Sequence, residues 1–412
     1  MTLTRSLSNY TKKSSQMHEV QEKIENYLAK KFRTSKSHST VKSYRIPLNR
    51  FTVFLKTKNT NIIEILKQIK DTKLDPISLL DEFYSDLSNN KKRLSNNTIR
   101  LYITVAKDFL NSEGCKIYNE DLHQRFRLPK KTQAYEEGLT KKTIYRIIRI
   151  AGQKLATIVL IICSSGMRIS EVIQIQVEDI DFTREPVTVL IRAQTTKTRE
   201  TRITCISTEA KLALQDYMQK SGITSGYIFL KTHEQKISEL KTRMETDQTK
   251  RGSFRTRDKK RIEELELELK TLPPEDIHAK AVFSTRHSLE NSLELLVEKI
   301  PDLSKKTENG RNIIHFHAFR AWFKTQVTDT HESDFAESLM GHKNLKLTYY
   351  RQNEKKRSET YLSVEHALTI SDTEAIDKNY SALQKDNLEL RGMVDSLAKQ
   401  LQNLESRIKI FN

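Results

Sequence analysis

Apolar residues recur at helical spacing along most of this 412-residue chain. Between residues 40 and 125 the pattern is regular, and one predicted helix face carries Val41, Tyr44, Leu48 and Phe51. The segment Ser95-Asn96-Asn97-Thr98 precedes another apolar series, and these residue types are favoured at the start of a helix. We therefore expect residues 40–125 to form a small all-helical domain of four or five helices.

The segments that flank this domain have a different character. Residues 1–39 are polar and contain one helical pattern, at 18–32, so we expect a loosely ordered N-terminal arm. Residues 126–137 read FRLPKKTQAYEE, and Pro129 interrupts any helix there. This second segment is predicted to be a linker to a further domain at residues 138–373.

One zone of the second domain has the pattern of strands. Residues 187–191 and 201–206 are rich in β-branched and apolar types, and residues 195–200 between them form a polar turn. Helical patterns surround this zone, and glycine and proline are sparse. The predicted fold is mainly α with a small β-hairpin or sheet, an α+β class.

Residues 232–276 form an insert in the second domain. A charged helical pattern is interrupted there by the basic run at residues 250–261. Two antiparallel helices with a basic tip fit this pattern. Contact of the tip with a polyanion and simple solvation both remain open.

The last segment, residues 377–412, has a heptad pattern. Leucine recurs at Leu383, Leu390, Leu397 and Leu404, and the other repeat contains Tyr380, Asn387, Val394, Leu401 and Ile408. This register predicts a two-stranded parallel coiled coil, and hence a homodimer, with Asn387 setting the register. The alternative is an amphipathic helix that docks on its own domain. Residues 371–378 are not basic, which argues against a zipper-type DNA reader.

The charge balance indicates a polyanionic partner. Lysine and arginine number 71 against 53 aspartates and glutamates, a formal net charge of +18. The longest apolar run, at residues 155–163, is far shorter than the roughly 20 residues of a membrane span, so we expect no membrane and favour nucleic acid. No secretory signal is evident, and three widely spaced cysteines suggest reduced thiols, so we expect a cytoplasmic, nucleoid-associated protein.

Two groups of basic residues are candidate DNA contacts. Lys91, Lys92, Arg93 and Arg100 crowd the start of one predicted helix. Lys130 and Lys131 follow the proline of the linker. The first group is either a solvated face or a set of phosphate contacts at a helix N-terminus. The two linker lysines are expected to contact DNA.

Four short pieces carry candidate chemistry. They are Gly166-Met167-Arg168 with Glu171, then Lys197 in the polar turn, His317 with Arg320, and Gly341-His342 followed by Tyr349 and Tyr350. Each piece alone is a weak signal, since an H-x-x-R or a paired tyrosine occurs readily by chance. Together they are more significant, because they occur in one order along the chain and each lies on the kind of element that its role requires.

These pieces resemble the signature of the tyrosine recombinases, the lambda-integrase group. The pattern is G-x-R-x-x-E, a hairpin lysine, H-x-x-R, then L-x-G-H before a tyrosine, and the resemblance covers residues 40–370. The ending Y-Y-R-Q-N-E at 349–354 is similar to integrases from archaea and their viruses or plasmids. The resemblance implies a helical core-binding, SAM-like DNA-binding domain at 40–125 and a catalytic domain at 138–373.

The chemistry explains why these residue types are needed. Arg168 and Arg320 can grip the non-bridging oxygens of a phosphodiester, whose charge grows toward the transition state. A tyrosine attacks phosphorus and forms a 3′-phosphotyrosine bond, and His317 is the candidate for proton removal or positioning. By resemblance, Lys197 protonates the leaving 5′-oxygen, His342 donates to the phosphate, and Glu171 holds Arg168.

The resemblance also implies partners and an absence of cofactors. A double-stranded attachment site is the expected substrate, with a tetramer assembled on the DNA. The covalent intermediate conserves the phosphodiester energy, so no metal or nucleotide is expected.

Two residue assignments and the biological role remain open. The Y-Y-R-x-x-E alignment favours Tyr349 as nucleophile, whereas the spacing from His342 favours Tyr350. Arg199 replaces Lys197 if the hairpin register is shifted. An integrase of a virus, plasmid or other mobile element is the preferred role. The alternatives are a dimeric DNA-binding regulator with an inactive recombinase fold, and a host resolvase of chromosome dimers.

Overall fold

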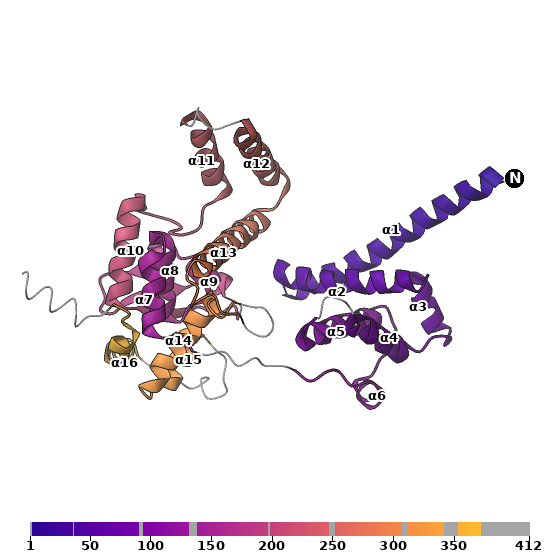
Figure 1. The fold of residues 1–412 in the computed structure, drawn as a ribbon, viewed down its shortest axis with the longest axis horizontal. Helices are drawn as coiled ribbons and strands as arrows, with labels where there is room; N and C mark the ends of the chain where they lie inside the picture. Colours follow the sequence, from indigo (N-terminus) through magenta and orange to yellow (C-terminus); the bar gives the residue numbers. More distant parts are fainter. Residues whose placement is uncertain are drawn as a thin grey trace, which may run out of the picture. The chain divides into compact units, whose positions relative to one another are not determined.

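The computed structural model describes residues 2–35, 37–89, 94–131, 138–196, 198–246, 252–306, 312–341 and 353–371. The chain divides into two compact units, Met1–Tyr135 and Glu136–Asn412. Each unit has its own hydrophobic core. Figure 1 labels the helices of both units.

The secondary-structure elements in the described part of unit 1 are all helices. Its helices are α1 (Thr2–Ser35), α2 (His38–Thr57), α3 (Ile62–Lys70), α4 (Pro76–Ser88), α5 (Asn96–Ser112) and α6 (Asn119–Arg125). Polar side chains cap several of them, as when Ser95 accepts a hydrogen bond from the Thr98 amide at the start of α5. The apolar faces enclose an aromatic core in which the Phe51 and Phe83 rings lie 5.0 Å apart, edge to face.

The expectation of a loosely ordered N-terminal arm is wrong for the end of α1. Ile24, Tyr27 and Leu28 are each only 2% exposed and belong to the core of unit 1. The Tyr27 hydroxyl donates to Asp108 on α5 at 2.8 Å, and the Tyr27 ring meets Phe109 edge to face. Most residues of this segment are polar, but these three apolar residues recur at helical spacing. They are enough to dock α1 on α2 and α5.

The predicted linker begins later than the sequence suggests. Phe126 is buried, and its ring packs 5.6 Å from that of Tyr84. The Arg100 guanidinium donates to the Pro129 carbonyl at 2.8 Å, and Asn96 donates to the Lys130 carbonyl at 3.1 Å. Residues 126–130 are therefore part of unit 1, because Phe126 lies in its core and side chains of α5 satisfy the carbonyls of Pro129 and Lys130.

The docking of α1 predicts a measurable contribution to stability. Leu28→Ala should lower the free energy of unfolding of unit 1 by about 3 kcal/mol, because it removes buried methyl groups and leaves a cavity. Urea unfolding of the full chain measures the change. Ile46→Ala, at a position that is 49% exposed, is the matched control and should change little. Equal, small effects of both substitutions would contradict the docking of α1.

Unit 2 is built around one buried helix, α8 (Gln153–Ser165). Ten of its residues are buried, which explains the long apolar run at this point of the sequence. Helices that pack on it from several sides include α7 (Lys141–Ile150), α10 (Thr208–Ser221), α14 (Phe316–Asp329) and α16 (Glu354–Leu368). The other described helices of the unit's body are α9 (Ile169–Val172), α13 (Pro274–Glu298) and α15 (Ser333–Met340), with short 3₁₀ turns at Val177–Asp179 and Ala193–Thr195.

A small antiparallel sheet lies beside this helix. It contains β1 (Ile180–Asp181), β2 (Val187–Ile191) and β3 (Arg202–Ile206), in the order β1-β2-β3. The register pairs Val187 with Ile206 and Ile191 with Arg202. The prediction of a mainly helical α+β fold with a small sheet is confirmed. The two-residue β1 was not anticipated, because so short a strand has no detectable alternation.

The insert consists of α11 (His233–Thr246) and α12 (Gly252–Thr271), which lie side by side in Figure 1. A hydrogen bond joins His233 Nε2 to Glu268 at 2.8 Å, and an ion pair joins Arg243 to Asp258 at 2.5 Å, so the two helices run antiparallel. Their small apolar seam is formed by Ile237, Ile262 and Leu265. Of the predicted basic tip, residues 250 and 251 lie outside the described residues.

Two further expectations concern membrane-spanning helices and the C-terminal coiled coil. Within the described ranges, the model has no helix with the length and apolar character needed to cross a membrane. The predicted coiled coil at residues 377–412 lies outside the described residues.

Candidate active site

The turn between α8 and α9 presents the first candidate motif. Gly166 ends α8 with a φ of +63°, a backbone conformation that favours glycine. A Cβ at this position would lie 2.4 Å from the Phe323 ring of α14. Glycine is thus required both by the backbone and by the close approach of α14. The turn places Arg168 at the N-terminus of α9.

Arg168 is held by Glu171 through two contacts. Its backbone N–H donates to Glu171 Oε2 at 2.8 Å, and its guanidinium Nη1 donates to Oε1 at 3.0 Å. The Glu171 side chain is fully buried, whereas that of Arg168 remains 26% exposed. A rigid buried carboxylate therefore orients a guanidinium that still reaches the surface.

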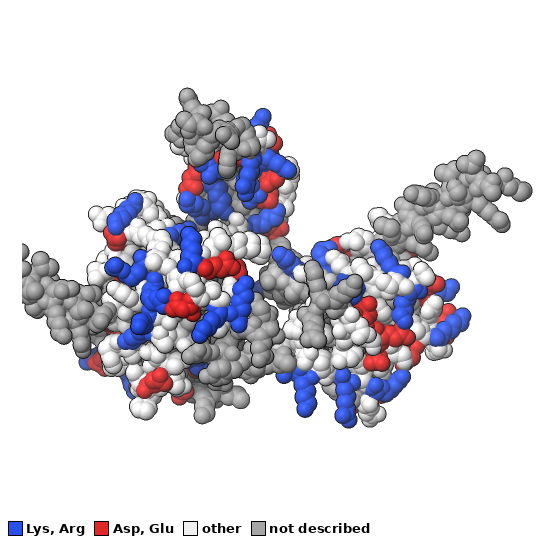
Figure 2. All heavy atoms as spheres, in the orientation of Figure 1, with Lys and Arg blue, Asp and Glu red and all other residues white. Residues whose placement is uncertain are grey.

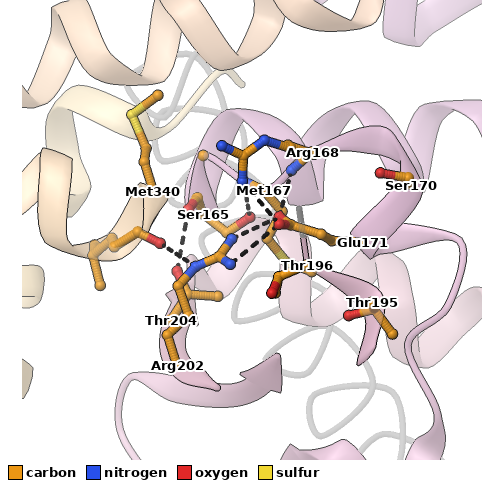
Figure 3. A network of polar contacts seen from close by, with 12 residues as sticks. Ser165, Met167, Arg168, Ser170, Glu171, Thr195, Thr196, Arg202, Thr204 and Met340 are labelled. Atoms are coloured by element: carbon orange, nitrogen blue, oxygen red, sulfur yellow. Dashed lines mark hydrogen bonds and ion pairs between the residues drawn. The ribbon is translucent and has the colours of Figure 1, made fainter. Parts of the chain in front are cut away.

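Arg202 is a third member of this network, and sequence reasoning missed it. Its Nη1 and Nη2 donate to the two Glu171 oxygens at 3.1 and 2.6 Å, and its Nε donates to the Leu339 carbonyl at 2.8 Å. Figure 3 shows Arg168 and Arg202 both directed at the Glu171 carboxylate. Strand alternation places Arg202 on the face of the buried Thr204 and Ile206, which is the signal that could have revealed it.

The environment keeps Glu171 ionised. Burial raises its pKa, but the hydrogen bonds and charge of Arg202, together with the N–H and charge of Arg168, outweigh burial. The pKa therefore lies below its ordinary value of 4.5. At neutral pH the pair of arginines and this carboxylate form a charged, hydrogen-bonded unit.

Arg320, on α14, approaches the same turn from a distant part of the sequence. It is 1% exposed and donates through Nη1 to the Gly166 carbonyl and through Nη2 to the Met340 carbonyl at 3.0 Å. Burial and, to a smaller degree, the nearby charge of Arg168 lower its pKa to about 9. Arg320 therefore remains protonated at neutral pH. Two cationic side chains that repel one another thus meet at this turn.

The end of α15 is fastened by two of these arginines. Arg202 binds the Leu339 carbonyl and Arg320 binds the Met340 carbonyl, so the final carbonyls of the helix receive charged donors. Gly341 follows with a φ of +68°, and a Cβ there would lie 2.9 Å from Arg202 Cδ. The chain is therefore fixed on the arginine cluster immediately before residue 342.

His317 occupies the first turn of α14. Its side chain is exposed, and its ring lies 6.3 Å from that of His315, which caps the helix by accepting from the Ala318 amide. His317 and Arg320 are three residues apart on this helix and so share one side of it.

Four predicted residues lie outside the described residues: Lys197, His342, Tyr349 and Tyr350. The structure does describe the base of the loop that carries Lys197. The buried Thr196 hydroxyl accepts from the Glu200 amide at 3.0 Å and donates to a backbone carbonyl. Arg199, the alternative to Lys197, is exposed and has a φ of +57°. The described residues that come together are Arg168, Glu171, Arg202 and Arg320.

The candidate DNA contacts are only partly described. Lys91, Lys92 and Arg93 lie outside the described residues, while Lys130 and Lys131 are exposed. Arg100 is half-buried and braces the segment that contains Pro129, so its described contact is with the chain itself. In the described parts of the chain, no group of three or more His, Cys, Asp or Glu residues could hold a metal ion.

The Arg202 contacts predict a pH-dependent loss of stability. Arg202→Met should lower the free energy of unfolding by about 3 kcal/mol at pH 7, because a buried carboxylate loses its main partner. In the native chain the lowered pKa of Glu171 stabilises the fold above 4.5, and this contribution is lost as pH falls through the folded pKa. In the variant, burial raises that pKa.

The difference between native and variant chains should therefore be largest at pH values above the raised pKa of the variant. It should shrink as pH falls from there through the lowered pKa of Glu171 in the native chain. Urea unfolding across this pH range measures it. Arg184→Met, which removes an exposed partner of Asp181, is the control and should have little effect at any pH. A penalty for Arg202→Met that does not change with pH would contradict the Glu171 contact.

Comparison with known proteins gives one family match. The model described as Phage integrase family matches residues 137–289. No curated protein sequence matches the chain significantly.

Several solved structures are similar at low identity. The XerH site-specific recombinase bound to its difH substrate shares 17% identity and a TM-score of 0.47, covering 82% of this chain and 83% of that one. A lambda integrase tetramer bound to a Holliday junction shares 12% identity and a TM-score of 0.48, covering 81% and 80%. The integrase from mycobacterium phage Brujita shares 13% identity and a TM-score of 0.35, covering 84% and 92%.

Proposed function

We propose that this chain, whose residues 137–289 carry a phage integrase family domain, is a site-specific tyrosine recombinase that cuts and rejoins DNA strands. One observation supports this proposal above the others. Arg168 and Arg320 converge on one turn, Arg320 reaching Gly166 from 154 residues away along the chain. A pair of converging guanidiniums is the arrangement that a phosphodiester requires as its charge grows toward the transition state.

The proposed reaction needs no external energy source. The hydroxyl of Tyr349 or Tyr350 attacks the scissile phosphorus, and the bond to the 5′-oxygen breaks as a 3′-phosphotyrosine bond forms. His317 accepts or positions the tyrosine proton, and Lys197 protonates the leaving 5′-oxygen. Attack by a 5′-hydroxyl on the phosphotyrosine reverses these steps and rejoins the strand.

The remaining residues hold the phosphate and its binders. Arg168 and Arg320 bind the non-bridging oxygens, and His342 donates a further hydrogen bond. Glu171 orients Arg168, and Arg202 in turn holds Glu171. Because Arg202 also binds the Leu339 carbonyl, it links the hairpin to the end of α15, three residues before His342. We assign Arg202 as a positioning residue.

The larger organisation follows from this activity. Residues 40–125 serve as a core-binding DNA domain and residues 138–373 as the catalytic domain, with Lys91, Lys92, Arg93, Arg100, Lys130 and Lys131 as candidate phosphate contacts. An integrase of a mobile element of the archaeal type is the favoured role, on the ending at residues 349–354. A host resolvase would share the chemistry, and an inactive regulator would share only the binding.

Removal of the tyrosines tests the mechanism. A binding site is first selected from random duplexes and then placed in a nicked suicide substrate, on which wild type should form a covalent protein–DNA adduct. Tyr349→Phe plus Tyr350→Phe should abolish the adduct, since phenylalanine lacks the attacking oxygen, and the two single variants identify the nucleophile. Denaturing gel electrophoresis measures adduct.

Tyr118→Phe, an exposed tyrosine of unit 1, is the matched control and should leave adduct formation unchanged. An adduct that survives in the double variant would overturn the mechanism. Tight binding by wild type with no adduct on any nicked site would favour the inactive regulator.

The heptads at residues 377–412 lead us to propose a homodimer that forms before DNA binding, with a tetramer on the DNA. Leu390→Ala plus Leu397→Ala should shift the free chain from dimer to monomer, because both leucines occupy the repeat expected at the seam. Sedimentation velocity without DNA measures the state. Lys399→Ala, outside both repeats, is the control. Identical sedimentation of all three proteins would overturn the zipper.

A further inference from the structure

A pocket of about 760 Å³ lies at the end of α8 that is remote from Arg168. Its walls come from the α7–α8 junction, from Lys236 in the first turn of α11 and Lys231 two residues before that helix, and from one side of α13. The 13 residues of α8 separate the pocket from the arginine cluster by about 20 Å at 1.5 Å per residue. The pocket is therefore no part of the site that would bind the scissile phosphate.

The polar lining of this pocket is basic and rich in hydroxyl groups. It contains the four lysines Lys154, Lys231, Lys236 and Lys299 and the four hydroxyl residues Ser284, Thr285, Ser288 and Ser292. None of the described residues that line it is an aspartate or glutamate. Figure 2 shows lysine and arginine side chains gathered where α11 and α12 join the rest of the unit.

The lysines crowd one another. Lys154 Nζ donates to the Phe229 carbonyl at 2.8 Å. Burial, together with the charges of Lys231 and Lys236, lowers the pKa of Lys154 to about 8, against an opposing effect of Glu239. Burial also lowers the pKa of Lys236. Lys231 is paired with Glu239 at 2.6 Å. This crowding of positive charge would be relieved by an anion in the pocket.

Two further features narrow the chemistry of that anion. The pocket includes Gly152 and Gln153 at the start of α8, where Gly152 provides no side-chain cap, so the helix N-terminus adds backbone N–H donors. Ile150 and Leu295 line another part and are 53% and 61% exposed. Ammonium, hydroxyl and backbone N–H donors together suit phosphate oxygens, and the apolar part suits a sugar or base.

We propose that this pocket is a second phosphate-binding site, which takes the phosphate groups of a nucleotide or of DNA away from the point of cleavage. Its volume lies in the range of small-molecule pockets, roughly 300–1,000 Å³. The shared chemistry is a phosphate ester held by Lys154, Lys236 and the start of α8. Free nucleotide and DNA are distinguished by the arms of the experiment.

The test measures binding of inorganic triphosphate, ATP and a short duplex to the full-length protein by titration calorimetry. Lys236→Gln should weaken binding of triphosphate about tenfold, the loss expected for one charge-assisted contact. Lys236→Gln leaves the Lys154–Phe229 bond in place, so the fold is preserved, and thermal unfolding checks this. Lys220→Gln removes an equally charged but exposed lysine of α10 and should change binding less than about twofold.

A loss confined to triphosphate and ATP assigns the pocket to a free nucleotide, whereas a loss for the duplex as well assigns it to DNA. Equal affinities of Lys236→Gln and Lys220→Gln for all three probes would overturn the proposal. So would failure of wild type to bind triphosphate or ATP together with no duplex loss in Lys236→Gln.

Proton uptake provides a second readout that does not depend on a variant. A bound phosphate should raise the pKa of Lys154 from about 8, so binding at pH 8 should take up protons from the buffer. Calorimetry in two buffers of different ionisation enthalpy measures this uptake. Lys154→Gln should abolish it, whereas Lys220→Gln should not. Uptake unchanged in Lys154→Gln would overturn the role of Lys154.

Discussion

The buried carboxylate of Glu171 is the constraint on which the rest of the candidate site depends. A carboxylate taken out of water is tolerated only when charged donors surround it. Here Arg168 donates from one side and Arg202 from the other. The requirement to satisfy one anion thus joins the start of α9 to strand β3, and the carbonyl contact of Arg202 extends the connection to the end of α15.

The cluster carries more positive than negative charge. Arg168, Arg202 and Arg320 lie near two buried carboxylates, Glu171 and Glu337, and Glu337 is also paired with Lys324. Arg320 uses its guanidinium to hydrogen-bond the backbone carbonyls of Gly166 and Met340. The excess remains, and a phosphodiester that reaches Arg168 would neutralise it. The same donors therefore stabilise the fold and, in the proposed function, bind the phosphate.

Much of the fold could be predicted because its signals are local. The run of β-branched residues at 187–191 predicts a strand, and Ser95 predicts the start of a helix. Both elements are present, as β2 and α5. The N-terminal arm and the start of the linker were misjudged, because Leu28 and Phe126 are buried by residues distant in sequence. Average polarity over a segment does not report such docking.

The candidate site also combines a local motif, which the sequence predicts, with long-range contacts, which it does not. The motif from Gly166 to Glu171 can be recognised from the sequence, because its glycine, arginine and glutamate lie within six consecutive residues. The contact of Arg202 with Glu171 spans 31 residues, and that of Arg320 with Gly166 spans 154. Such contacts are set by packing of α14 and β3 on α8, which no short sequence pattern encodes.

The central claim is that Arg168 binds the charge of the scissile phosphate. Replacement of one non-bridging oxygen by a methyl group removes that charge, and adduct formation can be compared on the two substrates. We predict that Arg168→Ala forms adduct at least about a hundredfold more slowly than wild type on the phosphodiester and recovers most of this loss on the methylphosphonate. An equal loss on both substrates, or no loss on the phosphodiester, would contradict the account.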